Sequence, residues 1–91
     1  MHIPSNPVEE LRVKEMGGKI VSDSMGNKRL GHPLWNPNFV NIGVTRAIGD
    51  YIFKKEEYIN KTTSGLIAIP SIKKWKLSVD DDFLIIASDG I

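Results

Sequence analysis

The sequence contains no cysteine and no long hydrophobic stretch, and its charges nearly cancel. Without cysteine the chain has no disulfide, no thiolate nucleophile and no sulfur-ligated zinc, so any metal must be bound by oxygen atoms or by the two histidines. The longest apolar run, residues 83–87, is too short to span a membrane, and no basic stretch leads into an apolar core near the N-terminus. We therefore expect a cytoplasmic or nuclear protein with no membrane partner.

The balance of charge argues against a nucleic-acid partner. Twelve basic and eleven acidic residues leave a net charge of +1, so no strong overall field attracts the chain to a polyanion. The composition, 41% hydrophobic and 25% charged, is that of an ordinary folded protein. A chain of 91 residues suits one small domain or part of a larger one.

The clearest local signal is a helix near the N-terminus. Asn6 is a good N-cap, Pro7 fits the first helical position, and Gly17 suits a left-handed C-terminal stop, which together predict a helix over about residues 7–16. The apolar residues that share one face of this helix are expected to pack on the core, with the charged residues turned elsewhere; they are Val8, Leu11 and Met16.

The remaining chain mixes turn residues with short strand signals. Turn-forming residues fill about 22–41, which predicts a long irregular loop. Alternation of apolar side chains predicts strands at about 39–45 and 67–79, and the apolar run at about 83–88 is typical of a strand buried on both faces. The fold class expected from these elements is α+β.

Asp89 is the candidate site residue. Asp89–Gly90 after a strand is commonly a hairpin turn, in which Gly accepts a positive φ. Alternatively, a rigid strand presents Asp89 as a hard oxygen ligand to Mg²⁺ or Mn²⁺, although one carboxylate cannot hold such an ion alone. Both interpretations follow from the residues.

Other polar groups allow a structural and a functional interpretation. Arg46 could bind phosphate, but an ion pair with Asp50 is the simpler expectation. His2 and His32 lack partners at metal-ligand spacing, which favours structural roles for both.

Two charged stretches near the end of the chain are expected to be solvated. Residues 80–82 are three consecutive aspartates, which suit an exposed turn better than a calcium loop. The lysines around Trp75 suit the solvent-facing side of a strand better than a nucleic-acid patch.

Three motifs in order resemble one protein family. The segments "HIPSNPVEELRVKEMGGKI", "VTRAIGDYIFK" and "DDDFLIIASDGI" are similar to consecutive segments of the metal-dependent Ser/Thr protein phosphatases of type 2C, and the similarity covers nearly the whole chain. The resemblance implies part of an α/β/β/α sandwich, in which acidic residues at one end bind two or more Mg²⁺ or Mn²⁺ ions. It also implies that Asp89 is one of those metal ligands. The loop at about 22–41 would correspond to a variable, flap-like segment beside the active site. Trp35 and Phe39 would there either contact a substrate or anchor the loop, and anchoring is favoured.

The same resemblance implies a function for the complete domain. Such a domain hydrolyses phosphoserine and phosphothreonine in phosphoprotein substrates by means of a metal-activated water molecule. This chain has Met1 where the family has an aspartate, and it carries a single expected ligand, so we expect the 91 residues alone to be inactive. The alternative is a non-catalytic pseudophosphatase or a partner-binding piece, and exposed strand edges could also lead to self-association.

Overall fold

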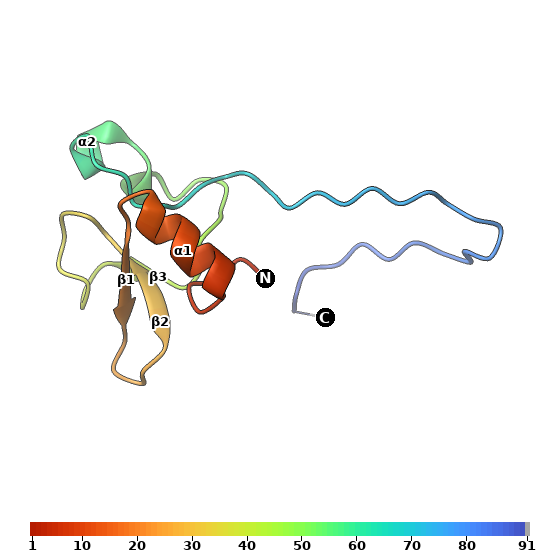
Figure 1. Ribbon diagram of the computed structural model, residues 1–91, viewed down its shortest axis with the longest axis horizontal. Helices are drawn as coiled ribbons and strands as arrows, with labels where there is room; N and C mark the ends of the chain where they lie inside the picture. Colours follow the sequence, from red (N-terminus) through yellow and green to blue (C-terminus); the bar gives the residue numbers. More distant parts are fainter. Residues whose placement is uncertain (91) are drawn as a thin grey trace.

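A computed structural model describes residues 1–90 and consists of a small folded body followed by a long arm (Figure 1). The elements of the body are the helix α1 (Pro7–Glu15), the strands β1 (Lys19–Ser22), β2 (Lys28–Gly31) and β3 (Asn41–Ile42), the 3₁₀ turn η1 (Tyr51–Phe53) and the short helix α2 (Glu56–Ile59). The arm, residues 68–90, extends away from the body and turns back on itself, which stretches the molecule to 53 Å along its longest axis.

Helix α1 begins and ends where the capping residues predict. The Asn6 side chain accepts a hydrogen bond from the Val8 amide at 3.0 Å, and Pro7 occupies the first helical position. At the other end, the amides of Gly17 and Gly18 donate to the carbonyls of Lys14 and Val13, and Gly17 has a φ of 88°. These two crossed bonds form a Schellman motif, which ends the helix one residue before the predicted position.

The predicted buried face of α1 is wrong. Val8 and Leu11 are 75% and 59% exposed, whereas Val13 and the charged Glu9 are buried. Glu9 and Val13 are four residues apart and therefore share a face, and it is this face that packs against the body. A charged residue can occupy it because two arginines pair with the Glu9 carboxylate, as described below.

The three strands form one antiparallel sheet in the order β1–β2–β3. Strands β1 and β2 are a hairpin with Lys19 opposite Gly31 and Ser22 opposite Lys28. In the connecting turn the Asp23 carboxylate accepts hydrogen bonds from the amides of Met25 and Asn27. The prediction of an irregular loop over 22–41 therefore missed β2, whose short sequence of two basic residues, Leu and Gly has no clear alternation. The strand predicted at 39–45 is reduced to β3.

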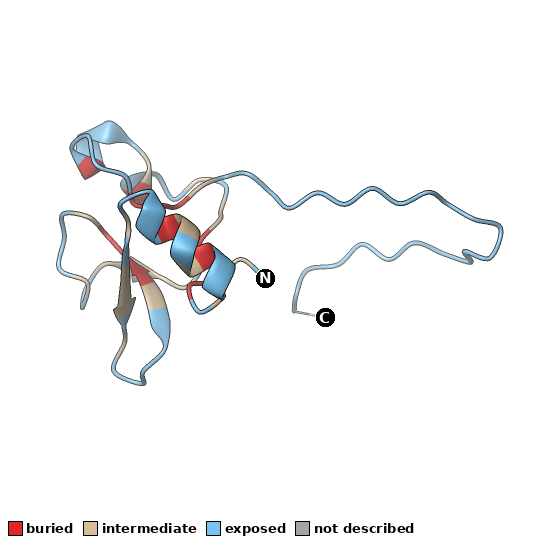
Figure 2. Cartoon of the chain, viewed as in Figure 1, coloured by how far each residue is buried: buried red, intermediate tan, exposed pale blue. Residues whose placement is uncertain are grey.

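The core lies between α1, the sheet and the segment that contains η1. Val13, Leu30, Phe53 and Leu66 form its buried cluster. Partly buried side chains from the strands and from the segment before η1 close this cluster. Figure 2 shows that buried residues are confined to the body, while the arm is exposed along its length. The core is consequently small.

The strands predicted at 67–79 and 83–88 are absent. Their backbone is extended, but apart from a parallel bridge between Arg46 and Ile67 these segments form no strand pairs within residues 1–90. A strand needs a hydrogen-bonded neighbour about 4.8 Å away, and neither leg of the arm has one in the described chain. The acidic turn is as predicted: the arm reverses near residues 79–80, where the Asp81 amide donates to the Ser78 carbonyl.

Replacement of Gly18 by alanine should destabilise the body. A Cβ atom at Gly18 would lie 2.2 Å from the Ser64 carbonyl oxygen and 2.7 Å from a methyl carbon of Val13, so the backbone would have to move. We expect Gly18→Ala to lower the free energy of unfolding by about 1–3 kcal/mol, measured by urea denaturation. Gly90→Ala is the matched control, because its Cβ would meet only the Ser88 hydroxyl at 3.6 Å. Equal stability of the two variants would contradict this packing.

Candidate functional site

The Glu9 carboxylate is a charged group buried in the body. Its Oε2 accepts a hydrogen bond from Arg12 Nε at 2.7 Å, and its Oε1 accepts one from Arg46 Nε, also at 2.7 Å. The Glu9 side chain is only 3% exposed. Hydrogen-bonded ion pairs of this kind offset the cost of burying a charge.

Each arginine also donates hydrogen bonds to backbone carbonyls from distant parts of the chain. Arg12 donates to the carbonyl oxygens of Gly65 at 2.9 Å and Thr45 at 3.1 Å. Arg46 donates to the carbonyl oxygen of Ile69 at 3.1 Å, at the base of the arm. The cluster of Glu9, Arg12 and Arg46, which we call the Glu9 cluster, thus joins α1 to two later segments.

The Glu9 cluster corrects the expectation for Arg46. The predicted partner, Asp50, is not the one observed; Arg46 pairs with Glu9, 37 residues earlier in the chain. Asp50 instead has a left-handed backbone with a φ of 52° and precedes η1. Its short side chain tolerates that conformation, which explains an Asp at this turn.

The pKa of Glu9 reflects two opposing effects. Burial raises this pKa, but hydrogen bonds and positive charge from Arg12 and Arg46 lower it, and the net shift is downward from the ordinary value of 4.5. A carboxyl group with a lowered pKa stabilises the folded state above its unfolded pKa, and this contribution is lost as the pH falls through the folded value.

His32 has a structural role, as expected. It is fully buried, its Nδ1 accepts hydrogen bonds from the amides of Leu34 and Trp35, and its Nε2 lies 2.6 Å from the Ile52 carbonyl oxygen. These partners require a neutral ring that carries its proton on Nε2. The Trp35 ring stacks on His32 with centroids 4.1 Å apart, which supports the anchoring interpretation for Trp35. Phe39, by contrast, is 85% exposed and anchors nothing.

Asp89, the predicted metal ligand, lies in a turn near the end of the exposed arm. Within residues 1–90 there is no group of three or more His, Cys, Asp or Glu side chains placed to bind a metal ion. A carboxylate oxygen suits Mg²⁺ or Mn²⁺ chemically, but these ions take about six oxygen ligands, so the described chain alone does not fit them. The role of Asp89 stays a prediction.

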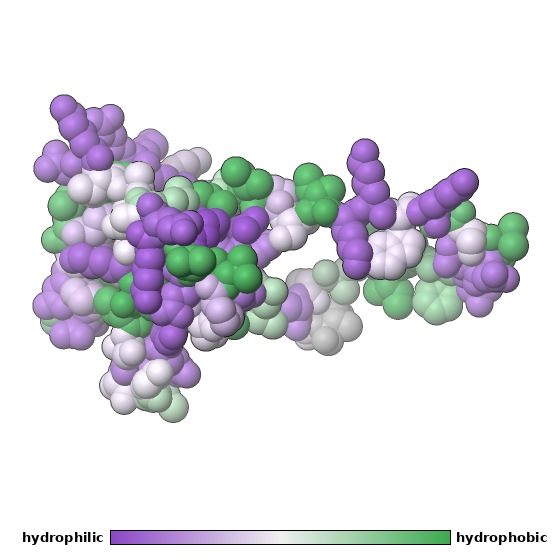
Figure 3. Space-filling model, viewed as in Figure 1, coloured by the Kyte–Doolittle hydropathy of each residue, from purple (hydrophilic) through white to green (hydrophobic). Residues whose placement is uncertain are grey.

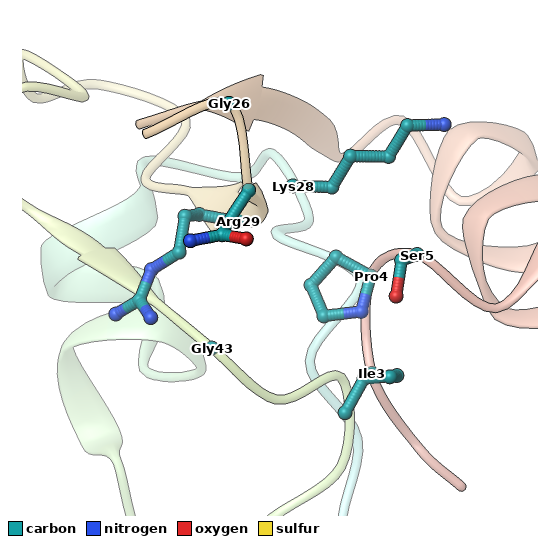
Figure 4. A pocket seen from close by; sticks show the side chains of 8 residues that line it. Ile3, Pro4, Ser5, Gly26, Lys28, Arg29 and Gly43 are labelled. Carbon is teal, nitrogen blue, oxygen red and sulfur yellow. The ribbon is translucent and has the colours of Figure 1, made fainter. Parts of the chain in front are cut away.

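One hollow of about 430 Å³ lies between the start of the chain and the β1–β2 hairpin, lined in part by Ser5, Lys28 and Arg29. Figure 4 shows that the Lys28 and Arg29 side chains point to opposite sides rather than toward one another. Lys28 is bonded to Glu10 and Arg29 to Asn41, each within 2.8 Å. Their charges therefore do not converge on a ligand in this hollow.

Comparison with known proteins identifies the family. The family model for protein phosphatase 2C matches residues 1–91, and the chain belongs to this family. The fold class is α+β, in agreement with the expectation, and the helix-and-sheet body is compatible with this family. Among the described residues, no helix is long and apolar enough to cross a membrane.

Individual relatives agree with the family match. The chain is 33% identical to probable protein phosphatase 2C 2 of Paramecium tetraurelia, over 99% of this chain and 26% of that protein. It is also 33% identical to protein phosphatase 1G of Homo sapiens, over 99% of this chain and 14% of that protein. The chain thus spans about a quarter or less of the length of these relatives. No solved structure matches it.

The Glu9 cluster was not predicted from the sequence, although a signal for it exists. Glu9 precedes Arg12 by three residues and Val13 by four, a spacing that places all three on adjacent positions of one helix surface. What the spacing does not reveal is the second guanidinium, because Arg46 comes from a segment 37 residues away.

Replacement of Glu9 by glutamine should unfold the chain or destabilise it strongly at neutral pH. The variant leaves two arginines without a buried anion, a loss of about 3–5 kcal/mol by analogy with other broken buried pairs. Glu10→Gln is the matched control, since Glu10 pairs with Lys14 and Lys28 in a less buried position and its loss should cost much less. Thermal unfolding followed by circular dichroism measures both.

The pH dependence of the unfolding free energy, compared between the parent and Glu9→Gln, tests the role of Glu9 separately. The parent chain should lose unfolding free energy as the pH falls below 4.5, where the unfolded state takes up protons before Glu9 does in the folded state. Glu9→Gln should lack that part of the acid loss. If its stability falls with acid as steeply as that of the parent, Glu9 is not the group responsible.

Proposed function

We propose that this chain is part of the catalytic domain of a protein serine/threonine phosphatase. The observation that carries the proposal is the protein phosphatase 2C match, which extends over every residue of the chain. The complete domain would remove phosphate from phosphoserine and phosphothreonine in proteins and depend on Mg²⁺ or Mn²⁺. A location in the cytoplasm or nucleus stays a prediction.

The arm supports the idea that further chain completes this domain. Its apolar side chains are largely exposed: Ile72, Leu77, Phe83 and Ile86 each have 80% or more of their surface accessible. Figure 3 shows such hydrophobic side chains along the arm. Apolar surface of this extent is stable in water only when something covers it. We infer that the legs of the arm become the predicted strands of the α/β/β/α sandwich when neighbouring strands pair with them.

Asp89 acquires a chemical role in this proposal. Strand pairing of residues 83–88 would hold its carboxylate rigidly, and ligands from other segments would complete the coordination of a hard divalent ion.

Phosphatase activity should therefore differ between the 91-residue chain and the longer protein. We expect the 91 residues to show no hydrolysis of a phosphoserine peptide with Mg²⁺ or Mn²⁺, and a protein extended to the length of its relatives to hydrolyse it. In the extended protein, Asp89→Asn should lower activity at least by the roughly 10–100-fold that loss of an outer-shell partner costs, whereas Asp80→Asn should not.

The same assay distinguishes the alternative. An extended protein that is folded but inactive would favour a pseudophosphatase or partner-binding role. Equal activity of the short and extended chains would refute the proposal that the site needs further ligands.

Self-association of the isolated chain is a further expected outcome. The arm presents unpaired backbone N–H and C=O groups beside exposed apolar side chains, which is the combination that promotes edge-to-edge pairing. Light scattering should give a mass that rises with protein concentration. Removal of residues 72–91 should abolish the rise, and a parent chain that stays monomeric would contradict edge pairing.

A further inference from the structure

All sulfur atoms of this chain belong to its three methionines, because the sequence has no cysteine. Met1 and Met25 are 83% and 85% exposed, and Met16, the C-cap of α1, is 39% exposed. A dissolved oxidant can therefore reach each of the three side chains. Within residues 1–90, the Met16 sulfur is the one that accepts a hydrogen bond. Met16 is consequently the methionine whose oxidation state is coupled to the fold.

The Met16 sulfur contacts the Glu9 cluster through Arg12. Arg12 Nη1 donates to Met16 Sδ at 3.2 Å and to the Gly65 carbonyl oxygen at 2.9 Å, so its two N–H groups serve two acceptors. The same guanidinium donates to Glu9 Oε2 and to the Thr45 carbonyl oxygen. A thioether is a weak acceptor, which makes the sulfur contact the weakest of these four. A stronger acceptor at Met16 would hold the guanidinium more firmly in the position from which it binds two later segments.

The surroundings of Met16 offer few other partners to a polar atom. Met16 lines a hollow of about 240 Å³ together with apolar side chains, which are those of Phe53, Ile59 and Leu66. The hydrogen-bonding side chains that line the same hollow already donate to backbone carbonyl oxygens; they are Lys54, Thr63 and Ser64. An oxygen atom added to the Met16 sulfur therefore finds its best partner in Arg12, which already donates to that sulfur.

We propose that Met16 is a site of reversible oxidation and that its sulfoxide oxygen replaces the sulfur as the acceptor for Arg12. Hydrogen peroxide transfers one oxygen atom to Sδ: the sulfur loses two electrons, the O–O bond breaks, and the remaining oxygen keeps both hydrogens and leaves as water. The new S–O group accepts a charge-assisted hydrogen bond from Arg12 Nη1, which is stronger than the bond to the thioether. This site lies in the body and requires neither Asp89 nor phosphatase activity.

Two variants of the full 91-residue chain separate the methionines. Met25→Leu leaves Met16 oxidisable, and Met16→Leu leaves Met25 oxidisable as the matched control. Each is labelled with ¹⁵N and treated with hydrogen peroxide, and peptide mass spectrometry locates the added oxygen atoms. Oxidation should shift the Arg12 Nε–H signal in Met25→Leu and leave it in place in Met16→Leu. An unchanged signal in Met25→Leu, or equal shifts in both variants, would overturn the proposal.

Thermal unfolding of the same samples tests the direction of the effect. Oxidation of Met25→Leu should raise its unfolding midpoint by about 2–5 °C, as expected for a strengthened hydrogen bond to a charged group in a small protein. Oxidation of Met16→Leu should leave the midpoint unchanged. A fall of the midpoint on oxidation of Met25→Leu would show that the sulfoxide disrupts apolar contacts instead, and the assignment of Arg12 as its partner would be wrong.

Reversibility distinguishes a switch from damage. Methionine sulfoxide reductases, one for each epimer of the sulfoxide, should remove the added oxygen from Met16 and return the Arg12 Nε–H signal to its original position. A shift that persists after the mass has returned would assign the change to another side chain and contradict the proposal.

A permanent acceptor provides a test without peroxide. Met16→Gln places an amide oxygen at the same number of bonds from the backbone as the sulfoxide oxygen. In this variant the Arg12 Nε–H signal should move in the same direction as in oxidised Met25→Leu. A shift in the opposite direction, or none, would contradict the role of Arg12 as donor.

Discussion

Pairing of one buried carboxylate with two guanidinium groups is the interaction on which this body depends. Glu9 sits inside the fold because Arg12 and Arg46 replace the water that it loses, each with a 2.7 Å hydrogen bond. The helix is rotated accordingly, with Glu9 and Val13 inward and Val8 outward. The small core, a cluster of four buried apolar residues, is assembled around that orientation.

The same cluster positions the segments from which the proposed function arises. Arg46 holds the Ile69 carbonyl oxygen and thereby the base of the arm. The direction of the arm then determines where residues 83–88 and Asp89 are presented to any neighbouring strands.

Local signals allowed some elements to be predicted and not others. The limits of α1 follow from Asn6, Pro7 and Gly17, whose effects act within one turn of the chain. The β1–β2 hairpin was missed because its second strand has little alternation and depends on its neighbours. The strands at 67–79 and 83–88 were expected from their apolar pattern, yet a pattern alone provides no hydrogen-bonding partner. The Asp89 prediction likewise depends on groups outside the described chain.

By itself, the sequence determined the start and end of the first helix, the absence of cysteine chemistry and, through three ordered motifs, the family. The tertiary structure alone decided which face of that helix is buried, which acid pairs with Arg46, and that His32 anchors a loop through Trp35. The physical reason is the distance along the chain between the residues that interact. Caps and turns involve residues a few positions apart, whereas burial of a charge depends on a counter-charge that the fold brings from 37 residues away.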